Sequence, residues 1–167
     1  RGTNFHDVYD ATGYGVAGAL NFSTTNGNFN DFGGAGGDDT VIGNGNTRLN
    51  YSSAAASVSV DLETSVIGTT NAVTVVGIAT GATEGTDSLT GVNAVQASVF
   101  DDTLLGSSFN NNFTGLGGND FIDGRGGFDT ASYNSLGLAT AGVSINLASG
   151  TATGDASIGT DTLRNVE

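Results

Sequence analysis

Side chains that can donate oxygen to a metal recur every nine residues in one stretch of the chain. Residues 97–132 divide into four blocks without an insertion: ASVFDDTLL, GSSFNNNFT, GLGGNDFID and GRGGFDTAS. The sixth position of the blocks is Asp102, Asn111, Asp120 and Asp129. The eighth position is Leu104, Phe113, Ile122 and Ala131. Because Ca²⁺ takes six or more hard oxygen ligands, a carboxylate set in a tight turn beside backbone carbonyls predicts calcium binding.

The other positions of each block explain how such a turn could be positioned. Glycine begins three of the blocks, at Gly106, Gly115 and Gly124, and the last two blocks continue with Gly117 and Gly126 at position three. Glycine permits left-handed backbone and close approach of neighbouring turns. Side chains alternate across a strand, so the apolar residue at position eight should point into a core. Each block therefore predicts a glycine-rich turn followed by a short strand.

Two further stretches carry the same pattern less completely. The sequence FGGAGGDDTVIGNGN at 32–46 places Asp39 at position six and Val41 at position eight, with Gly34 and Gly36 in the turn. The sequence GTNFHDVYDATG at 2–13 places Asp7 at position six but lacks most of the glycines. We expect Asp39 to bind calcium, and we regard the second stretch as a degenerate copy in which Asp7 is still a candidate calcium ligand.

The nine-residue pattern resembles the RTX, or hemolysin-type, calcium-binding repeat, and nonapeptide β-helix repeats of this kind are a known calcium-binding signature. The resemblance implies an all-β fold, a right-handed parallel β-roll or β-helix solenoid, in which two nonapeptides complete one coil. It also implies that the chain is exported unfolded through a type I secretion channel. With eighteen residues per coil, Asp102 would stack on Asp120 at one edge and Asn111 on Asp129 at the other. Neutral Asn111 should make the second edge bind calcium more weakly.

A longer period of about 80 residues encloses the short one. The segments 36–46, 57–62 and 85–93 correspond to 117–127, 142–147 and 159–167, and Tyr51 corresponds to Tyr133. We therefore predict two repeat units, residues 1–93 and 94–167. The start of the chain aligns with 96–108. Such ends suit one unit of a tandem array, whose neighbours would be copies of the same protein stacked end to end, and they suit equally an arbitrary cut through a long RTX protein. The stretches 55–62, 71–80 and 141–150 alternate like strands and predict longer rungs or small sheet excursions.

Composition argues against several classes of function. Lys and Arg total 4 against 17 Asp and Glu, which gives a formal net charge of -13. Nucleic acid and anionic membranes are therefore unfavourable partners, because both need concentrated positive charge. Cys is 0, so thiolate zinc sites and disulfides are excluded. Trp is 0 and His6 is the only histidine, so neither an aromatic-lined glycosidase cleft nor a histidine-based zinc site is expected.

The same composition predicts how the chain folds. Self-repulsion and 28 glycines oppose compaction, so we expect disorder without cations and folding when calcium neutralises the carboxylates. We expect no enzymatic activity and a secreted or bacterial cell-surface location. The favoured role is a calcium-stabilised building block of an adhesin, surface layer or filament, with cell-surface glycans as a possible partner. Two alternatives stay open: a folding and secretion module of a type I-secreted enzyme or toxin, and a β-helical carbohydrate-active domain.

Overall fold

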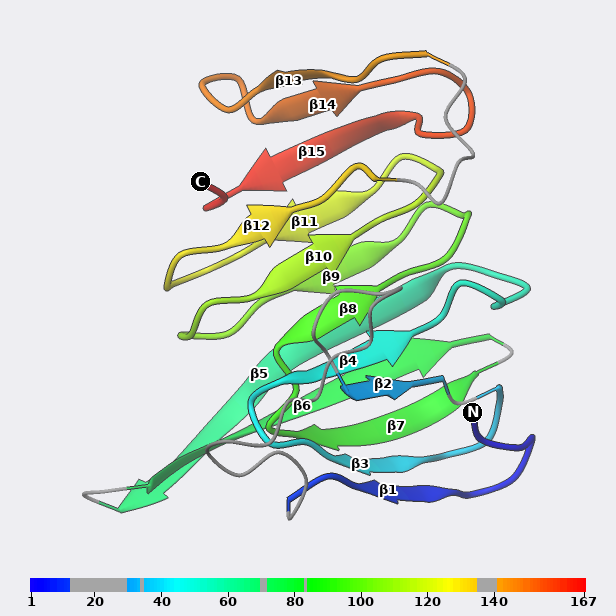
Figure 1. The fold of residues 1–167 in the computed structure, drawn as a ribbon, viewed down its shortest axis with the longest axis vertical. Helices are drawn as coiled ribbons and strands as arrows, with labels where there is room; N and C mark the ends of the chain where they lie inside the picture. The colour runs from blue at the N-terminus through cyan, green and yellow to red at the C-terminus, as the bar shows by residue number, and fades with distance from the viewer. Residues whose placement is uncertain (13–29, 34, 70–71, 83, 135–140) are drawn as a thin grey trace.

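The chain is built from short strands. In a computed structural model, residues 1–12, 30–33, 35–69, 72–82, 84–134 and 141–167 are described, and they form fifteen β-strands and no helix. The all-β prediction is therefore confirmed for this part of the chain. None of the described segments is a helix long and apolar enough to cross a membrane. The strands form two sheets that lie face to face, and in Figure 1 the strands of each sheet follow one another along the long axis of the molecule.

The smaller sheet has five strands, all parallel to one another. In order across the sheet these are β12 (Thr130–Ala131), β10 (Asn112–Thr114), β8 (Ala94–Gln96), β4 (Thr47–Asn50) and β2 (Asn30–Phe32).

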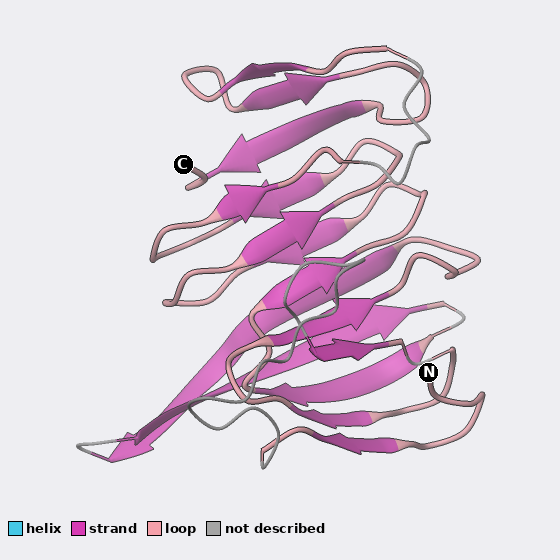
Figure 2. Ribbon diagram, in the orientation of Figure 1, coloured by secondary structure: helices cyan, strands magenta, loops and turns pink. Residues whose placement is uncertain are grey.

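The larger sheet has ten strands and mixes parallel and antiparallel pairs. Its first half, in order, is β1 (Val8–Asp10), β3 (Thr40–Ile42), β7 (Gly85–Thr90), β6 (Ala72–Gly81) and β5 (Val58–Thr69). Its second half is β9 (Thr103–Leu105), β11 (Phe121–Asp123), β15 (Thr160–Arg164), β14 (Thr151–Thr153) and β13 (Ser144–Asn146). Figure 2 shows that β5 and β6 extend together well beyond the rest of the sheet as a long hairpin.

Consecutive nine-residue blocks contribute strands to the two sheets in turn. Thr103 in β9 pairs with Phe121 in β11 of the larger sheet, and Ala94 in β8 pairs with Asn112 in β10 of the smaller one. Both pairs are eighteen residues apart, so every block lies beside the block after next, as we predicted. Parallel pairing at this constant offset brings equivalent turn residues of successive blocks together at each edge.

One hydrophobic core lies between the two sheets and includes residues from both predicted repeat units. The apolar residues at position eight form its centre, because they point inward from each short strand. Val41, Leu104 and Phe113 are completely buried, and Ile122 is 1% exposed. Ala131 and Tyr9 are partly buried and pack against this cluster.

The predicted longer strands form two antiparallel meanders, and β5 also pairs in parallel with β9 of the array. The stretch 55–62 leads into β5, 71–80 becomes β6, and 141–150 contains β13. In the first meander β5 pairs with β6 and β6 with β7, and in the second β13 pairs with β14 and β14 with β15. These pieces are therefore excursions of the larger sheet, which was one of the two forms that we expected.

Candidate calcium-binding turns

The residues at position six form ladders along the two edges of the array. Asp120 Oδ1 accepts the backbone N–H of Asp102 at 2.9 Å, and Asp129 Oδ1 accepts that of Asn111 at 2.7 Å. In the N-terminal half, Asp39 Oδ1 accepts the N–H of Asp7 at 2.9 Å. Each side chain thus bonds to the equivalent residue of the block that lies next to it in the sheet. The stacking predicted for the two edges is present, and it fixes one carboxylate oxygen of each Asp.

The second carboxylate oxygen has no hydrogen-bond partner in three of these turns. Oδ2 is buried and unpartnered in Asp39, Asp120 and Asp129. A buried carboxylate oxygen without a donor is costly unless a cation lies against it. We call the segments 35–39, 116–120 and 125–129 the open turns.

Glycine leaves the space that these oxygens use. A Cβ added at Gly115 would overlap Asp120 Oδ2, and one added at Gly124 would overlap Asp129 Oδ2. Gly36, Gly117 and Gly126 occupy position three of the open turns, whereas Gly34 lies outside the described residues. The open turns of Asp120 and Asp129 therefore present a buried carboxylate directly to glycine backbone.

The open turns share a backbone conformation that the other turns lack. The residue at position two has a positive φ in each of them: 93° at Ala35, 75° at Leu116 and 64° at Arg125. Position four also has a positive φ and is glycine each time: Gly37, Gly118 and Gly127. A positive φ is costly for a residue with a Cβ, so three such residues in equivalent places indicate a turn shaped for a specific purpose.

A hydroxyl group completes the remaining three turns. Ser98 Oγ donates to Asp102 at 2.8–2.9 Å, Ser107 Oγ to Asn111 Oδ1 at 3.2 Å, and Thr3 Oγ1 to Asp7 Oδ2 at 3.0 Å. The backbone N–H of the same Ser or Thr also donates to that side chain. We call the segments 3–7, 98–102 and 107–111 the closed turns. Here the side-chain oxygens of Asp102, Asn111 and Asp7, which we expected to hold calcium, accept hydrogen bonds from their own turn.

Burial dominates the electrostatics of the open turns. Desolvation raises the pKa of Asp120 to about 8 and also raises the pKa of Asp39 and of Asp129. Carboxylates with such pKa values lack stabilisation of their charged form, which a bound cation would supply. No three His, Cys, Asp or Glu side chains gather as a metal cluster in the described part of the chain. A cation at an open turn would therefore take most of its ligands from backbone carbonyl oxygens, which suits Ca²⁺.

Two ladder residues escaped the sequence analysis. The nine-residue pattern did not single out Asp87 and Asp161, which are buried, at 2% and 1% exposed. Asp87 Oδ1 accepts the N–H of Asp39 at 2.9 Å, and Asp161 Oδ1 accepts that of Asp120 at 3.0 Å. Tyr51 Oη donates to Asp87 Oδ2 at 2.6 Å, so this carboxylate has a partner on each oxygen. The signal was available, since both residues precede an apolar residue by two positions, as at positions six and eight.

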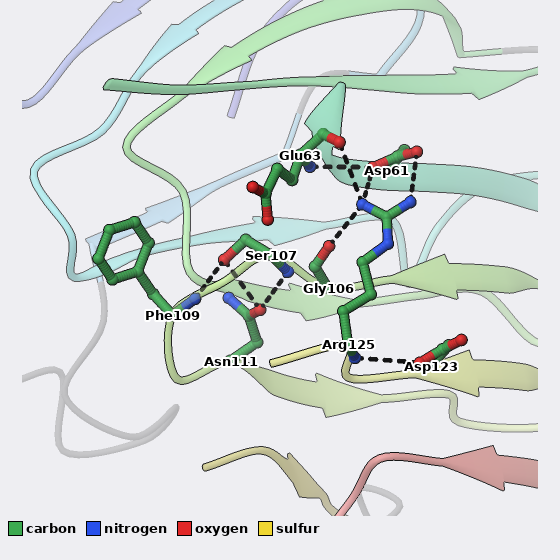
Figure 3. A network of polar contacts seen from close by, with 8 residues as sticks. All are labelled: Asp61, Glu63, Gly106, Ser107, Phe109, Asn111, Asp123 and Arg125. Carbon is green, nitrogen blue, oxygen red and sulfur yellow. Dashed lines mark hydrogen bonds and ion pairs between the residues drawn. The ribbon is translucent and has the colours of Figure 1, made fainter. Parts of the chain in front are cut away.

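The positively charged side chain of Arg125 lies at the edge of the array that contains Asn111. The Arg125 guanidinium bonds to both carboxylate oxygens of Asp61, at 2.7 and 2.9 Å. It also donates to the carbonyl oxygens of Gly106, at 2.9 Å, and of Glu63, at 3.1 Å. Figure 3 shows the guanidinium between Asp61 and Gly106, next to the Ser107–Asn111 pair. Arg125 therefore links strand β5 to the array through an oxygen-rich cradle.

Comparison with known families agrees with this geometry. Residues 97–131 match, in four copies, the family model described as the RTX calcium-binding nonapeptide repeat. These residues are RTX calcium-binding repeats. Repeats of this family bind Ca²⁺. The matched segment contains the open turns of Asp120 and Asp129, whose unpartnered buried oxygens fit such an ion. No curated protein matches the chain.

Proposed function

We propose that the chain is a non-catalytic, calcium-stabilised extracellular repeat module and a building block of a surface adhesin, surface layer or filament. The observation that carries this proposal is the set of three buried, unpartnered carboxylate oxygens, each on a glycine turn at the edge of a parallel strand array. Alternation of strands between two sheets at an eighteen-residue offset supports a right-handed β-roll as the form of that array.

The proposed calcium ligands are the carboxylates of Asp39, Asp120 and Asp129. Backbone carbonyls of their turns would complete each site, with Gly36, Gly117 and Gly126 at position three. When bound, Ca²⁺ supplies the positive charge that these buried oxygens lack. The chain itself positions each carboxylate through its ladder hydrogen bond and excludes water by burying it.

The free energy of calcium binding then contributes directly to the free energy of folding. The chain has a formal net charge of -13, and each open turn buries a carboxylate with one oxygen to which no described group donates a hydrogen bond. Self-repulsion and desolvation both oppose the folded state until cations neutralise them. A chain of this kind stays extended where calcium is scarce and folds where it is abundant, which suits a protein exported before it folds.

We assign no calcium to the closed turns, which revises the ligand role expected for Asp102, Asn111 and Asp7. Their hydroxyl and amide donors satisfy the oxygen that an ion would otherwise contact. Three ions per chain is therefore the expected stoichiometry for the described turns.

The test combines ion counting with spectroscopy. Native mass spectrometry and isothermal titration calorimetry should give three tightly bound Ca²⁺ ions, and far-UV circular dichroism should change from disordered in chelator to β-rich in millimolar calcium. The triple variant Asp39→Asn, Asp120→Asn and Asp129→Asn should lose all three ions. Asp10→Asn removes an exposed carboxylate outside the open turns and should keep them. A chain that is fully folded in chelator and binds no calcium would refute the proposal.

A further inference from the structure

The ten-stranded sheet is the same five-strand arrangement used twice. Its order is β1-β3-β7-β6-β5 followed by β9-β11-β15-β14-β13. In each half the first three strands are parallel to one another. The third, fourth and fifth strands then form an antiparallel meander.

Register repeats as well as order. Ala79 pairs with both Val60 and Asp87 in the first half, and Ala152 pairs with both Ile145 and Asp161 in the second. Glycines at the start of the equivalent strands agree in conformation: φ is 83° at Gly85, the first residue of β7, and 80° at Gly159, directly before β15. Strand β13 is therefore the counterpart of β5, and Ile145 is the counterpart of Val60.

The two counterparts differ in what covers them. Strand β5 is followed in the sheet by β9, with Val60 beside Leu104, and Val60 is completely buried. Strand β13 is the last strand of the sheet, and Ile145 is 49% exposed. Two residues further along each strand, Leu62 is 2% exposed whereas its counterpart Leu147 is 51% exposed. An edge strand with exposed apolar side chains is a template for pairing with another strand.

The opposite end of the sheet carries the matching edge. Strand β1 is the first strand and the counterpart of β9, with Val8 at the position of Thr103 and Tyr9 at that of Leu104. Val8 is 65% exposed. The turn before it also matches, since Thr3 closes on Asp7 just as Ser98 closes on Asp102.

We propose that β13 of one copy of this chain pairs in parallel with β1 of the next, in the register of the internal β5–β9 junction. That register places Ser144 beside Val8, Ile145 beside Tyr9 and Asn146 beside Asp10. The inference deepens the proposed function, on which it rests, by naming the partner as a second copy of the chain or the next repeat. It also gives the predicted units, 1–93 and 94–167, a physical meaning, because each supplies five consecutive strands.

A hydrogen bond at the internal junction supports this register. Asp102 Oδ1 accepts the backbone N–H of Val58 at 2.7 Å, across the boundary between the two halves. The counterparts of these residues are Asp7 and Val143. Asp7 Oδ2 is bound by Thr3, in the same way that Ser98 binds Asp102 Oδ2, which orients Oδ1 for the N–H of Val143 in the adjoining copy.

Cysteine cross-linking tests the register, because the natural chain contains no cysteine. Asp10→Cys and Asn146→Cys are prepared as separate proteins, saturated with calcium, mixed and treated with a short bismaleimide. Cross-linked dimer should form in the mixture and not in either protein alone. Thr153→Cys, exposed on β14 and one strand in from the edge, replaces Asn146→Cys in the matched control and should give no dimer. Equal dimer in the control mixture, or none in the test mixture, would overturn the proposal.

Sedimentation of the chain without cysteines gives a second readout. Ile145→Asp places a charge at the pairing position and should weaken association at least tenfold. Phe109→Asp is the control, since Phe109 is 50% exposed, close to the 49% of Ile145, and lies in a closed turn that belongs to neither edge strand. Ile145→Asp and Phe109→Asp with equal association constants would also overturn the proposal. Calorimetry on the same samples separates the two failures: three bound ions without cross-linking would refute the junction and leave the calcium-binding function standing.

Discussion

Replacing one Asp in an open turn and one in a closed turn should give opposite results in an ion count. Asp120 and Asp102 both occupy position six, lie on the same edge and are 2% exposed. They differ in their second oxygen, which is unpartnered in Asp120 and bonded to Ser98 in Asp102. Asp120→Asn should therefore remove one bound ion, and Asp102→Asn should remove none.

The size of the effect follows from linkage. When the free calcium concentration is a hundred times the dissociation constant of a site, the bound ion stabilises the folded state by about 2.7 kcal/mol. For a chain of this size that corresponds to a fall in Tm of about 5–10 °C in Asp120→Asn. Asp102→Asn weakens hydrogen bonds within its turn and should cost about 1 kcal/mol.

The assay is native mass spectrometry for the ion count, with thermal unfolding at fixed free calcium for the stability. Both variants keep a side-chain oxygen for the ladder, so both should still fold. The reasoning is refuted if Asp102→Asn loses an ion, or if Asp120→Asn retains three ions at the calcium concentration that saturates the natural chain.

Three further predictions address the turns and the arginine clamp. Changing Ala97→Gly, Ser98→Leu, Val99→Gly and Phe100→Gly together gives the first block the residues of the third at positions one to four, and calorimetry should then show a fourth ion. Three ions would mean that turn sequence does not decide occupancy. Burial raises the pKa of Asp120 to about 8 from 3.8, so without calcium the folded state binds more protons than the unfolded chain between about pH 4 and 8 and loses stability as pH rises through that window. Calcium must displace those protons, so its apparent affinity should rise from pH 6 to pH 8, with proton release seen as a buffer-dependent heat; a pH-independent affinity would contradict it. Arg125→Gln should lower the free energy of unfolding by roughly 1 kcal/mol, because the ion pair is partly exposed, and should speed amide hydrogen exchange in β5. The control Arg164→Gln should leave exchange in β5 unchanged, and equal exchange in the two variants would argue against the clamp.

The array itself could be read from the sequence, because its period is uninterrupted. Four in-register blocks fix which residues point inward and which meet at the edges, so the positions of Leu104, Phe113, Asp120 and Asp129 followed directly. The distinction between open and closed turns was also present, as a Ser or Thr four residues before the Asp or Asn. It was overlooked because a hydroxyl in a polar turn is locally unremarkable until its hydrogen bond is seen.

Other features depend on contacts between distant residues and could not be predicted from local pattern. Arg125 and Asp61 are 64 residues apart, and nothing near either residue indicates their pairing. In the first antiparallel meander, β5 and β6 are much longer than the three-residue strands of the array and pair with each other. The position of Asp87 could be read from Leu89 two residues later, but its bonds to Tyr51 and Asp39 depend on the fold.

The closed turns have a consequence for a stalk made of many such chains. A hydroxyl bond does not depend on calcium, so as calcium falls through its binding midpoint the segments held by Ser98, Ser107 and Thr3 would lose their local shape after the open turns between them. Such a stalk would soften in alternating bands before the whole array unfolds, and calcium returned at that stage would stiffen it without renucleation. Pulling single arrays at decreasing calcium concentrations would show this as extension in discrete steps, each ending at a closed turn.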